Sequence, residues 1–169
     1  MISQADPTPA NIASARANCH PAWKHLSPRD CEVWAQFLAL NLILIDEQIY
    51  DLRLAGPKDN PLAPDVHHQA MWVTLRKKRV DVILRSGAYW WLIEVKTTSS
   101  MSALGQLLTY RYHLRAEHPE MAPLITACVC EREDGDVSPL YSKNQILVLP
   151  TAEPRSGLDS LVAAASKEA

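Results

Sequence analysis

Several features that would place this chain of 169 residues in a special class are missing or scarce. No apolar run reaches the roughly 18 residues needed to span a bilayer, and the longest, from Phe37 to Ile45, is interrupted by Asn41. The N-terminal segment MISQADPTPA has no positively charged region followed by an apolar stretch, as a secretory signal would have. We therefore expect a cytoplasmic protein without a membrane partner.

Cysteine is sparse, and its spacing does not suggest a metal site. The chain has four cysteines, Cys19, Cys31, Cys128 and Cys130. The last two form a C-x-C pair rather than the C-x-x-C of common zinc and redox sites. In a cytoplasmic protein all four are expected to be reduced, and we interpret the C-x-C pair as small buried apolar residues.

An excess of positive charge is also missing. The formal net charge of −2 argues against a surface coated with basic residues, but a local patch is enough to attract phosphate. Arg76, Lys77, Lys78 and Arg79 form such a patch just before Asp81. It fits either a solvated strand edge, where charge discourages edge pairing, or a nucleic-acid contact.

The length fits one domain, since typical domains have roughly 100–200 residues. We predict a domain over residues 21–150, between a flexible arm at 1–20 and a polar arm at 151–169. Ser27 and Pro28 are typical of a helix start, and glycine and proline mark the ends of the strands. The predicted helices cover residues 27–40 and 103–116, and the predicted strands cover 49–54, 79–85, 89–96, 124–130 and 145–149.

This order of elements predicts an α/β fold with a mixed central sheet flanked by helices. Ser86-Gly87-Ala88 is expected to join the second and third strands in a hairpin. Residues 58–65 are predicted as a loop, and residues 66–75 are ambiguous.

A group of charged side chains interrupts two otherwise apolar strands. Because side chains alternate along a strand, Glu94 and Lys96 share a face, and the hairpin places Asp81 beside Glu94 to within one register step. Two such carboxylates repel unless a cation lies between them, and Mg²⁺ or Mn²⁺ is the expected occupant. A structural ion pair with Lys96 is the alternative, although burying charge in an apolar strand is costly.

Other polar and aromatic side chains lie near this group in the sequence. Gln106 and Tyr110 are one turn apart on the second predicted helix, so they share a face. A polar helix face with a half-buried tyrosine would explain them equally well. Trp90 lies on the Glu94 side of its strand and could stack on an unpaired base, or it could pack within the hairpin.

The ordered set of residues resembles the PD-(D/E)xK nuclease superfamily and, within it, the RecB-like exonuclease group. Glu94-Val95-Lys96 matches the acid-x-Lys motif, and Asp81 matches the upstream aspartate, although Val80 replaces the usual proline. The segment 106–110 matches the Gln-x-x-x-Tyr of the RecB-like group, and Glu32 stands where the family often has a first-helix glutamate. The resemblance covers residues 27–130 and implies a restriction-endonuclease-like αβββαβ core.

The resemblance also implies an activity, a metal-dependent hydrolysis of phosphodiester bonds of DNA. Asp81, Glu94 and the Val95 carbonyl would bind Mg²⁺ or Mn²⁺, with Glu32 assisting directly or through water. Lys96 would orient or deprotonate the attacking water. Gln106 and Tyr110 would position the phosphate backbone or the lysine.

Three questions stay open at this level. Asp65, which follows Pro64, is a second candidate for the metal aspartate. Some relatives hold an iron–sulfur cluster with one upstream and three downstream cysteines, but only Cys128 and Cys130 lie downstream, so we expect no cluster. A catalytically silent DNA-binding or assembly module, or a nuclease, restriction or transposase subunit active only with a partner, is the alternative to a stand-alone nuclease of a phage, mobile element, repair or recombination system. A homo-oligomer or a larger complex is compatible with each of these.

Overall fold

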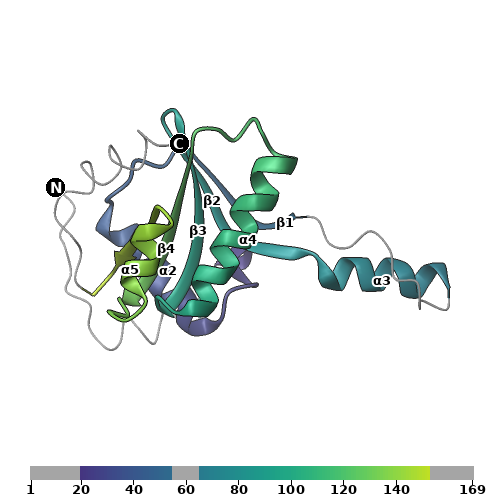
Figure 1. Cartoon of the computed structure of the whole chain (residues 1–169), viewed down its shortest axis with the longest axis horizontal. Coiled ribbons are helices and arrows are strands. Elements are labelled where there is room, and N and C mark those ends of the chain that lie inside the picture. Colours follow the sequence, from purple (N-terminus) through teal and green to yellow (C-terminus); the bar gives the residue numbers. More distant parts are fainter. Residues whose placement is uncertain (1–19, 55–64, 153–169) are drawn as a thin grey trace.

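The computed structural model describes residues 20–54 and 65–152, apart from the side chains of residues 74–76. Within these ranges the chain forms a five-stranded sheet with helices on both faces (Figure 1). Most of the predicted arms at 1–20 and 151–169 and of the predicted loop at 58–65 lies outside the described residues, which exclude 1–19, 55–64 and 153–169. The elements in chain order are η1 (Pro21–Trp23), α2 (Pro28–Leu40), β1 (Glu47–Leu54), α3 (Val66–Arg76), β2 (Lys78–Ser86), β3 (Tyr89–Thr98), α4 (Met101–Glu117), β4 (Leu124–Arg132), α5 (Ser138–Lys143) and β5 (Ile146–Pro150).

The strands lie in the sheet in the same order as in the sequence, from β1 to β5. β1, β2 and β3 are antiparallel neighbours, whereas β3, β4 and β5 run parallel. The predicted hairpin closes at Ser86 and Tyr89, and Gly87 takes a φ of 58°, which glycine adopts without strain. The α/β class and the mixed sheet expected from the sequence are confirmed.

Each face of the sheet is covered by its own apolar core. α2 packs on one face, where Trp34 meets Trp91 of β3, and α4 and α5 pack on the other, where Leu107 meets Leu92. Figure 1 shows α4 and α5 on the near side of the sheet and α2 behind it. Each of these fully buried side chains contributes roughly 2 kcal/mol or more to folding. Alternation along β3 therefore sends Glu94, two residues after Leu92, toward the α4 side.

The helix starts follow the predicted capping chemistry. The Ser27 hydroxyl accepts the backbone N–H of Asp30 and caps α2, which begins at Pro28. Ser100 rather than Ser102 caps α4, because its hydroxyl accepts the N–H of Ala103. These contacts satisfy backbone donors that a helix leaves unpaired in its first turn, so the sequence signals place both helices correctly.

The regular alternation of β1 and β2 breaks where Asp51 faces Asp81. The ladder pairs Tyr50 with Val82 and then Leu52 with Val80, passing over the two aspartates, and Asp51 has a φ of 56°. As a result Val80 packs in the α4-side core and Val82 in the α2-side core. Two residues that strict alternation would place on one face therefore lie on opposite faces, and Asp81 lies at the irregular point between them.

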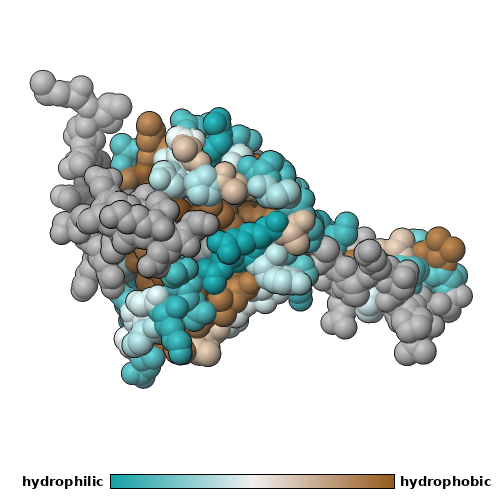
Figure 2. All heavy atoms as spheres, turned by 45° about the horizontal axis from the view of Figure 1, so that its top comes forward, coloured by the Kyte–Doolittle hydropathy of each residue, from teal (hydrophilic) through white to brown (hydrophobic). Residues whose placement is uncertain are grey.

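The structure contains two helices, α3 and α5, that were not predicted from the sequence. The ambiguous segment 66–75 forms α3, which projects beyond the ends of β1 and β2 (Figure 1). Its residues Val66 and Met71 are exposed, and apolar atoms are visible at the outer end of this helix in Figure 2. The short helix α5 was not predicted, and its buried Tyr141 donates to the carbonyl of Ser100.

The cysteines divide into two groups. Cys128 and Cys130 are free and fully buried on β4, as expected of small apolar residues. Cys31 is disulfide-bonded, so the expectation of reduced thiols is wrong for this residue. No helix within residues 20–54 and 65–152 is long and apolar enough to cross a membrane.

Candidate active site

Three charged side chains from β2 and β3 meet at one point. The Lys96 ammonium lies 2.6 Å from Oε1 of Glu94 and 3.6 Å from Oδ2 of Asp81. The same Oδ2 of Asp81 accepts the backbone N–H of Val95 at 2.9 Å. Glu94 is fully buried, Asp81 nearly so, and the Lys96 side chain is 29% exposed. The predicted convergence of these three groups is thus present in the structure.

The hairpin register explains why they meet. Val82 pairs with Ile93 in the antiparallel ladder, so the next position outward brings Asp81 opposite Glu94. The ladder between β2 and β3 ends there, at the irregular backbone of Asp81. The N–H of Val95 therefore donates to the Asp81 side chain rather than to a backbone carbonyl of β2. Lys96 follows Glu94 by two residues and therefore reaches the same face of the sheet.

Burial strongly perturbs the protonation of this cluster. Burial, together with the charge of Asp81, raises the pKa of Glu94 to about 8. Burial also raises the pKa of Asp81, although the Lys96 ammonium and the Val95 N–H oppose this. For Lys96, burial disfavours the ammonium, but the charges of Asp81 and Glu94 outweigh it and hold the lysine pKa above its usual value. Several strongly perturbed pKa values within one buried cluster are frequent at functional sites.

Gln106 and Tyr110 of α4 lie against the cluster. The amide Nε2 of Gln106 donates to Oη of Tyr110 at 3.0 Å, and the tyrosine ring is buried in the α4-side core. Burial raises the pKa of Tyr110, the Gln106 hydrogen bond opposes the rise, and the charges of Glu94 and Asp81 add to it. The structure therefore brings Tyr110 within electrostatic reach of the two acids, and Gln106 is joined to it by a hydrogen bond.

The α2 side of the site differs from the prediction. Glu32 is half-buried on α2, but the acid of this helix whose charge raises the pKa values of Asp81 and Lys96 is Asp30. The helix dipole alone would explain an acid in the first turn of α2. Nothing in the sequence showed that this turn approaches the carboxyl ends of the central strands.

His25 is a second residue that the sequence did not indicate. Its Nε2 lies 2.9 Å from the backbone carbonyl of Asp81. Because a carbonyl oxygen only accepts, the ring must donate from Nε2 in this contact. His25 thereby ties the segment before α2 to the irregular point of β2, and it offered no motif by which it could have been found.

Two carboxylates of the cluster, those of Asp81 and Glu94, are candidate ligands for a divalent cation. Within residues 20–54 and 65–152, no three His, Cys, Asp or Glu side chains gather into a potential metal-binding group. Glu32 therefore does not stand as a third direct ligand beside Asp81 and Glu94. In the same part of the chain, however, Oε2 of Glu94 is buried without a hydrogen-bond partner, and hard cations prefer carboxylate oxygens of this kind. Two carboxylates and an orphaned buried oxygen fit a cation that completes its shell with water or backbone carbonyls.

The competing aspartate lies elsewhere. Asp65 caps α3, where its Oδ1 accepts the N–H of His68 at 2.8 Å and its Oδ2 lies 2.8 Å from Nδ1 of the same histidine. Figure 1 shows this helix projecting away from the sheet. Asp81, and not Asp65, lies beside Glu94 and Lys96.

The predicted nucleic-acid contacts are spread over the molecule. Lys77 and Lys78 are exposed near the start of β2, and Nε of Arg79 is paired with Oδ1 of Asp51 at 2.5 Å. Arg76 ends α3, and its side chain lies outside what the structure describes. Trp90 is half-buried against the α4-side core near the start of β3. Six residues, or roughly 20 Å of extended strand, separate it from Lys96.

Comparisons with known proteins add little to this geometry. No family model and no curated protein matches the chain. Among solved structures it is similar to the crystal structure of a protein of unknown function, AF1548, at 9% sequence identity and a TM-score of 0.40. The match covers 78% of this chain and 62% of that chain, so the present chain spans less than two thirds of its neighbour. The functional case therefore depends on the site itself.

Proposed function

We propose that the protein is a metal-dependent nuclease that hydrolyses phosphodiester bonds of DNA on a PD-(D/E)xK-type core. One observation carries the proposal: the fully buried Glu94 has an unpartnered oxygen beside Asp81 and Lys96. Removing an ion from water costs several kcal/mol, and an apolar residue at this central position of β3 would avoid that cost. Retention of the charged cluster is therefore better explained by chemistry than by stability.

Asp81 and Glu94 are the residues that would hold a divalent cation, together with the Val95 carbonyl. The cation supplies charge neutralisation at the phosphate and acidifies nearby water when bound. Asp81 is already oriented for this role, because the Val95 N–H fixes one of its oxygens. Glu94 is held within an apolar strand, which excludes water from its carboxylate.

Lys96 is better suited to donate than to accept a proton. The neighbouring carboxylates hold its pKa above the usual value, which favours the ammonium. An ammonium can orient the attacking water by its oxygen and stabilise the negative charge that develops on the phosphate. The partial exposure of its side chain lets this donor reach a substrate. Between the two roles expected from the sequence, orientation is favoured over deprotonation.

The Gln106–Tyr110 pair would act as a positioning unit. Tyr110→Phe removes the hydroxyl that accepts from Gln106 but keeps the buried ring, so we expect cleavage to fall about 10- to 100-fold, as for other outer contacts of metal sites. Gln106→Ala should have a similar effect, and the double variant should be little worse than either single variant, since both changes remove one contact. Initial rates at saturating metal would measure this.

Tyr89→Phe is the matched control for these variants. Tyr89 begins β3, where it packs against the α2-side core at the opposite end of the strand from Lys96, so loss of its hydroxyl should leave the rate unchanged. Equal rates for wild type and the Tyr110→Phe variant would show that the pair has only a packing role.

A silent relative is the second candidate. The lack of a third acidic, histidine or cysteine ligand within residues 20–54 and 65–152 favours a module that binds DNA without cutting it. Such a module would keep the fold and the basic residues but would gain nothing from Mg²⁺ or Mn²⁺. DNA as the partner and the cytoplasm as the location are parts of the same proposal.

The deciding experiment compares cleavage with and without metal. We expect the purified protein to cut single-stranded or linear duplex DNA with Mg²⁺ or Mn²⁺ and to be inactive in a chelator, with RNA as the parallel substrate. Either cation should also raise the melting temperature, because a ligand at about 100 times its Kd stabilises the folded state by about 2.7 kcal/mol. Binding of DNA without cleavage in any metal would support the silent module instead.

A further inference from the structure

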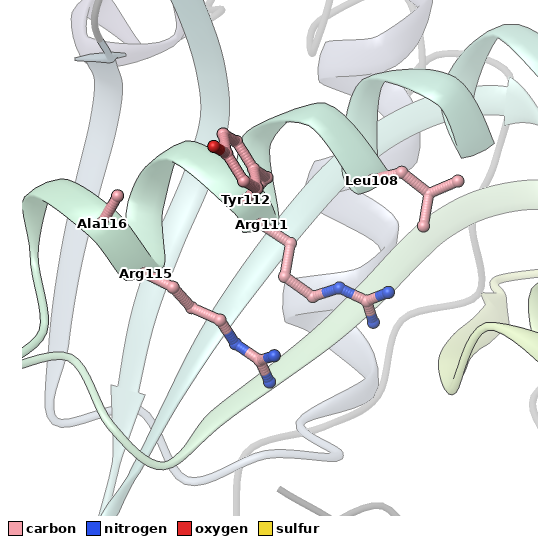
Figure 3. A pocket seen from close by; sticks show the side chains of 5 residues that line it. All are labelled: Leu108, Arg111, Tyr112, Arg115 and Ala116. Atoms are coloured by element: carbon pink, nitrogen blue, oxygen red, sulfur yellow. The ribbon is translucent and has the colours of Figure 1, made fainter.

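A second, positively charged feature lies on α4, away from the acidic cluster. An open groove of about 500 Å³ is lined by Leu108, Arg111, Tyr112, Arg115 and Ala116. Figure 3 shows the two arginine side chains extending from the helix to the same side, with their guanidinium groups near one another. Leu108 and Ala116 supply an apolar lining, and Tyr112 is largely exposed at the rim.

The charge of this groove is not neutralised within the described part of the chain. Arg111 uses Nη1 to donate to the backbone carbonyl of Asn144 at 2.8 Å, and neither arginine has a carboxylate within ion-pair distance among those residues. Burial lowers the pKa of Arg111, and the positive charge of Arg115 lowers it further. Two like charges held together in this way, one of them half-buried, favour an anion between them.

Guanidinium groups identify the class of anion. Their planar donors match the oxygens of a phosphate, and they bind it through charge-assisted hydrogen bonds. An exposed tyrosine beside a phosphate site is the arrangement with which proteins bind single strands, because the ring can stack on an unpaired base. The apolar lining formed by Leu108 and Ala116 suits the same partner better than it suits a free inorganic ion.

The groove and the acidic cluster lie on different flanks of α4. Gln106 and Arg115 are nine residues apart, which corresponds to about half a turn around a helix of 3.6 residues per turn. They are also separated by about 13 Å along the helix axis. One phosphate therefore cannot occupy both places, but a strand several nucleotides long can.

We propose that the Arg111–Arg115 groove binds a phosphate of the nucleic-acid strand outside the cleavage centre, with Tyr112 available to a neighbouring base. The proposal rests on the proposed nuclease function, since it assigns this groove to the same substrate. The groove raises the affinity of the protein for a strand that is long enough to extend along α4. The groove itself does not take part in the chemistry. Short substrates held only at the acidic cluster gain nothing from it.

Binding of a fluorescent single-stranded oligonucleotide of about 12 nucleotides, within the usual range of strand site sizes, tests the groove in the presence of a chelator. Arg115→Gln should weaken binding several-fold and reduce the slope of log K against log salt by about 0.7, the value for one lost phosphate contact on a single strand. Arg115→Lys, which keeps the charge, should restore most of both. A trinucleotide should bind the wild type and the Arg115→Gln variant equally.

Arg85→Gln is the matched control, because Arg85 is a partly exposed arginine at the far end of β2, where it pairs with Glu47. It should leave both affinity and salt slope unchanged. An unchanged affinity and salt slope for Arg115→Gln would overturn the proposal that the groove binds a phosphate. An equal loss of affinity in Arg85→Gln, or a wild type that does not bind the oligonucleotide, would overturn it as well. Since Arg115 lies in the last turn of α4, a merely structural role would change the melting temperature without changing the salt slope.

The two proposals fail separately. If Lys96→Ala cleaves like the wild type, the assigned catalytic cluster is wrong, whereas the binding data on Arg115 still stand as measured. If Lys96→Ala is inactive but Arg115→Gln binds like the wild type, only the assignment of the groove to nucleic-acid binding is wrong.

Discussion

Replacement of Lys96 by alanine is expected to lower metal-dependent DNA cleavage by about 10²- to 10³-fold, the usual effect of removing one preorganised donor from a reaction centre. Lys96 provides the only positive charge in contact with the two acids among the described residues. Without this ammonium, the two acids have no positive side chain in contact with them among the described residues to stabilise the charge that develops on the phosphate. The rate at saturating Mg²⁺ measures the effect.

The fold should survive this substitution. Glu94, whose pKa is about 8, already holds a proton at neutral pH, and loss of the ammonium favours that proton further, so the substitution does not leave Glu94 as an unpaired buried charge. Far-ultraviolet circular dichroism and the melting transition would verify that the variant is folded. Lys96→Arg serves as a second variant, because it keeps the charge but replaces a compact donor by a planar one.

Lys143→Ala is the control for charge removal, since Lys143 is exposed at the end of α5. Its cleavage rate should equal that of the wild type. A wild-type rate in the Lys96→Ala variant would remove the catalytic assignment, and the cluster would then be structural.

The parts of the fold that could be predicted are those that local rules determine. Ser27 and Ser100 cap helices in the way that short hydroxyl side chains do anywhere, and Gly87 supplies the turn that fixes the hairpin register. From that register alone, alternation on β3 places Glu94 and Lys96 together and brings Asp81 opposite. This explains why the central acids and lysine of the site could be located without coordinates.

The parts that could not be predicted depend on contacts between distant segments. The irregular point at Asp51 and Asp81 exists because two strands lose their alternation together, which no single strand reveals. Asp30 and His25 approach the site because the start of α2 packs near the ends of the central strands. Glu32 matched the family pattern by position, and the structure in addition brings the charge of Asp30 close enough to raise the pKa of Asp81.

Replacement of Glu94 by glutamine is expected to stabilise the metal-free protein while abolishing cleavage. Folded Glu94 keeps its proton up to about pH 8, whereas an unfolded glutamate loses it near pH 4.5. Between these values the folded state binds more protons than the unfolded state, so the free energy of unfolding of the wild type falls as pH rises. Glutamine has no such proton, and the variant lacks this slope.

The stability advantage of Glu94→Gln should therefore grow from about pH 5 to about pH 8 and then level off. Its size is on the order of 2–4 kcal/mol, because each pKa unit corresponds to about 1.4 kcal/mol and the contact with Lys96 offsets part of the cost. Asp81, whose pKa is also raised by burial, is present in both proteins, so its own pH dependence does not add to this difference. Urea unfolding of both proteins in a chelator, at several pH values, measures the difference.

Glu47→Gln is the control, because the Glu47 side chain is 47% exposed on β1. Its free energy of unfolding should differ from that of the wild type by an amount that does not change across this pH range. A constant or shrinking advantage for Glu94→Gln would contradict the buried, protonated state of Glu94. The same variant should show no rise in melting temperature with Mn²⁺, because it lacks one carboxylate ligand. A gain in stability combined with a loss of metal response and cleavage is expected only where a buried acid is kept for its chemistry.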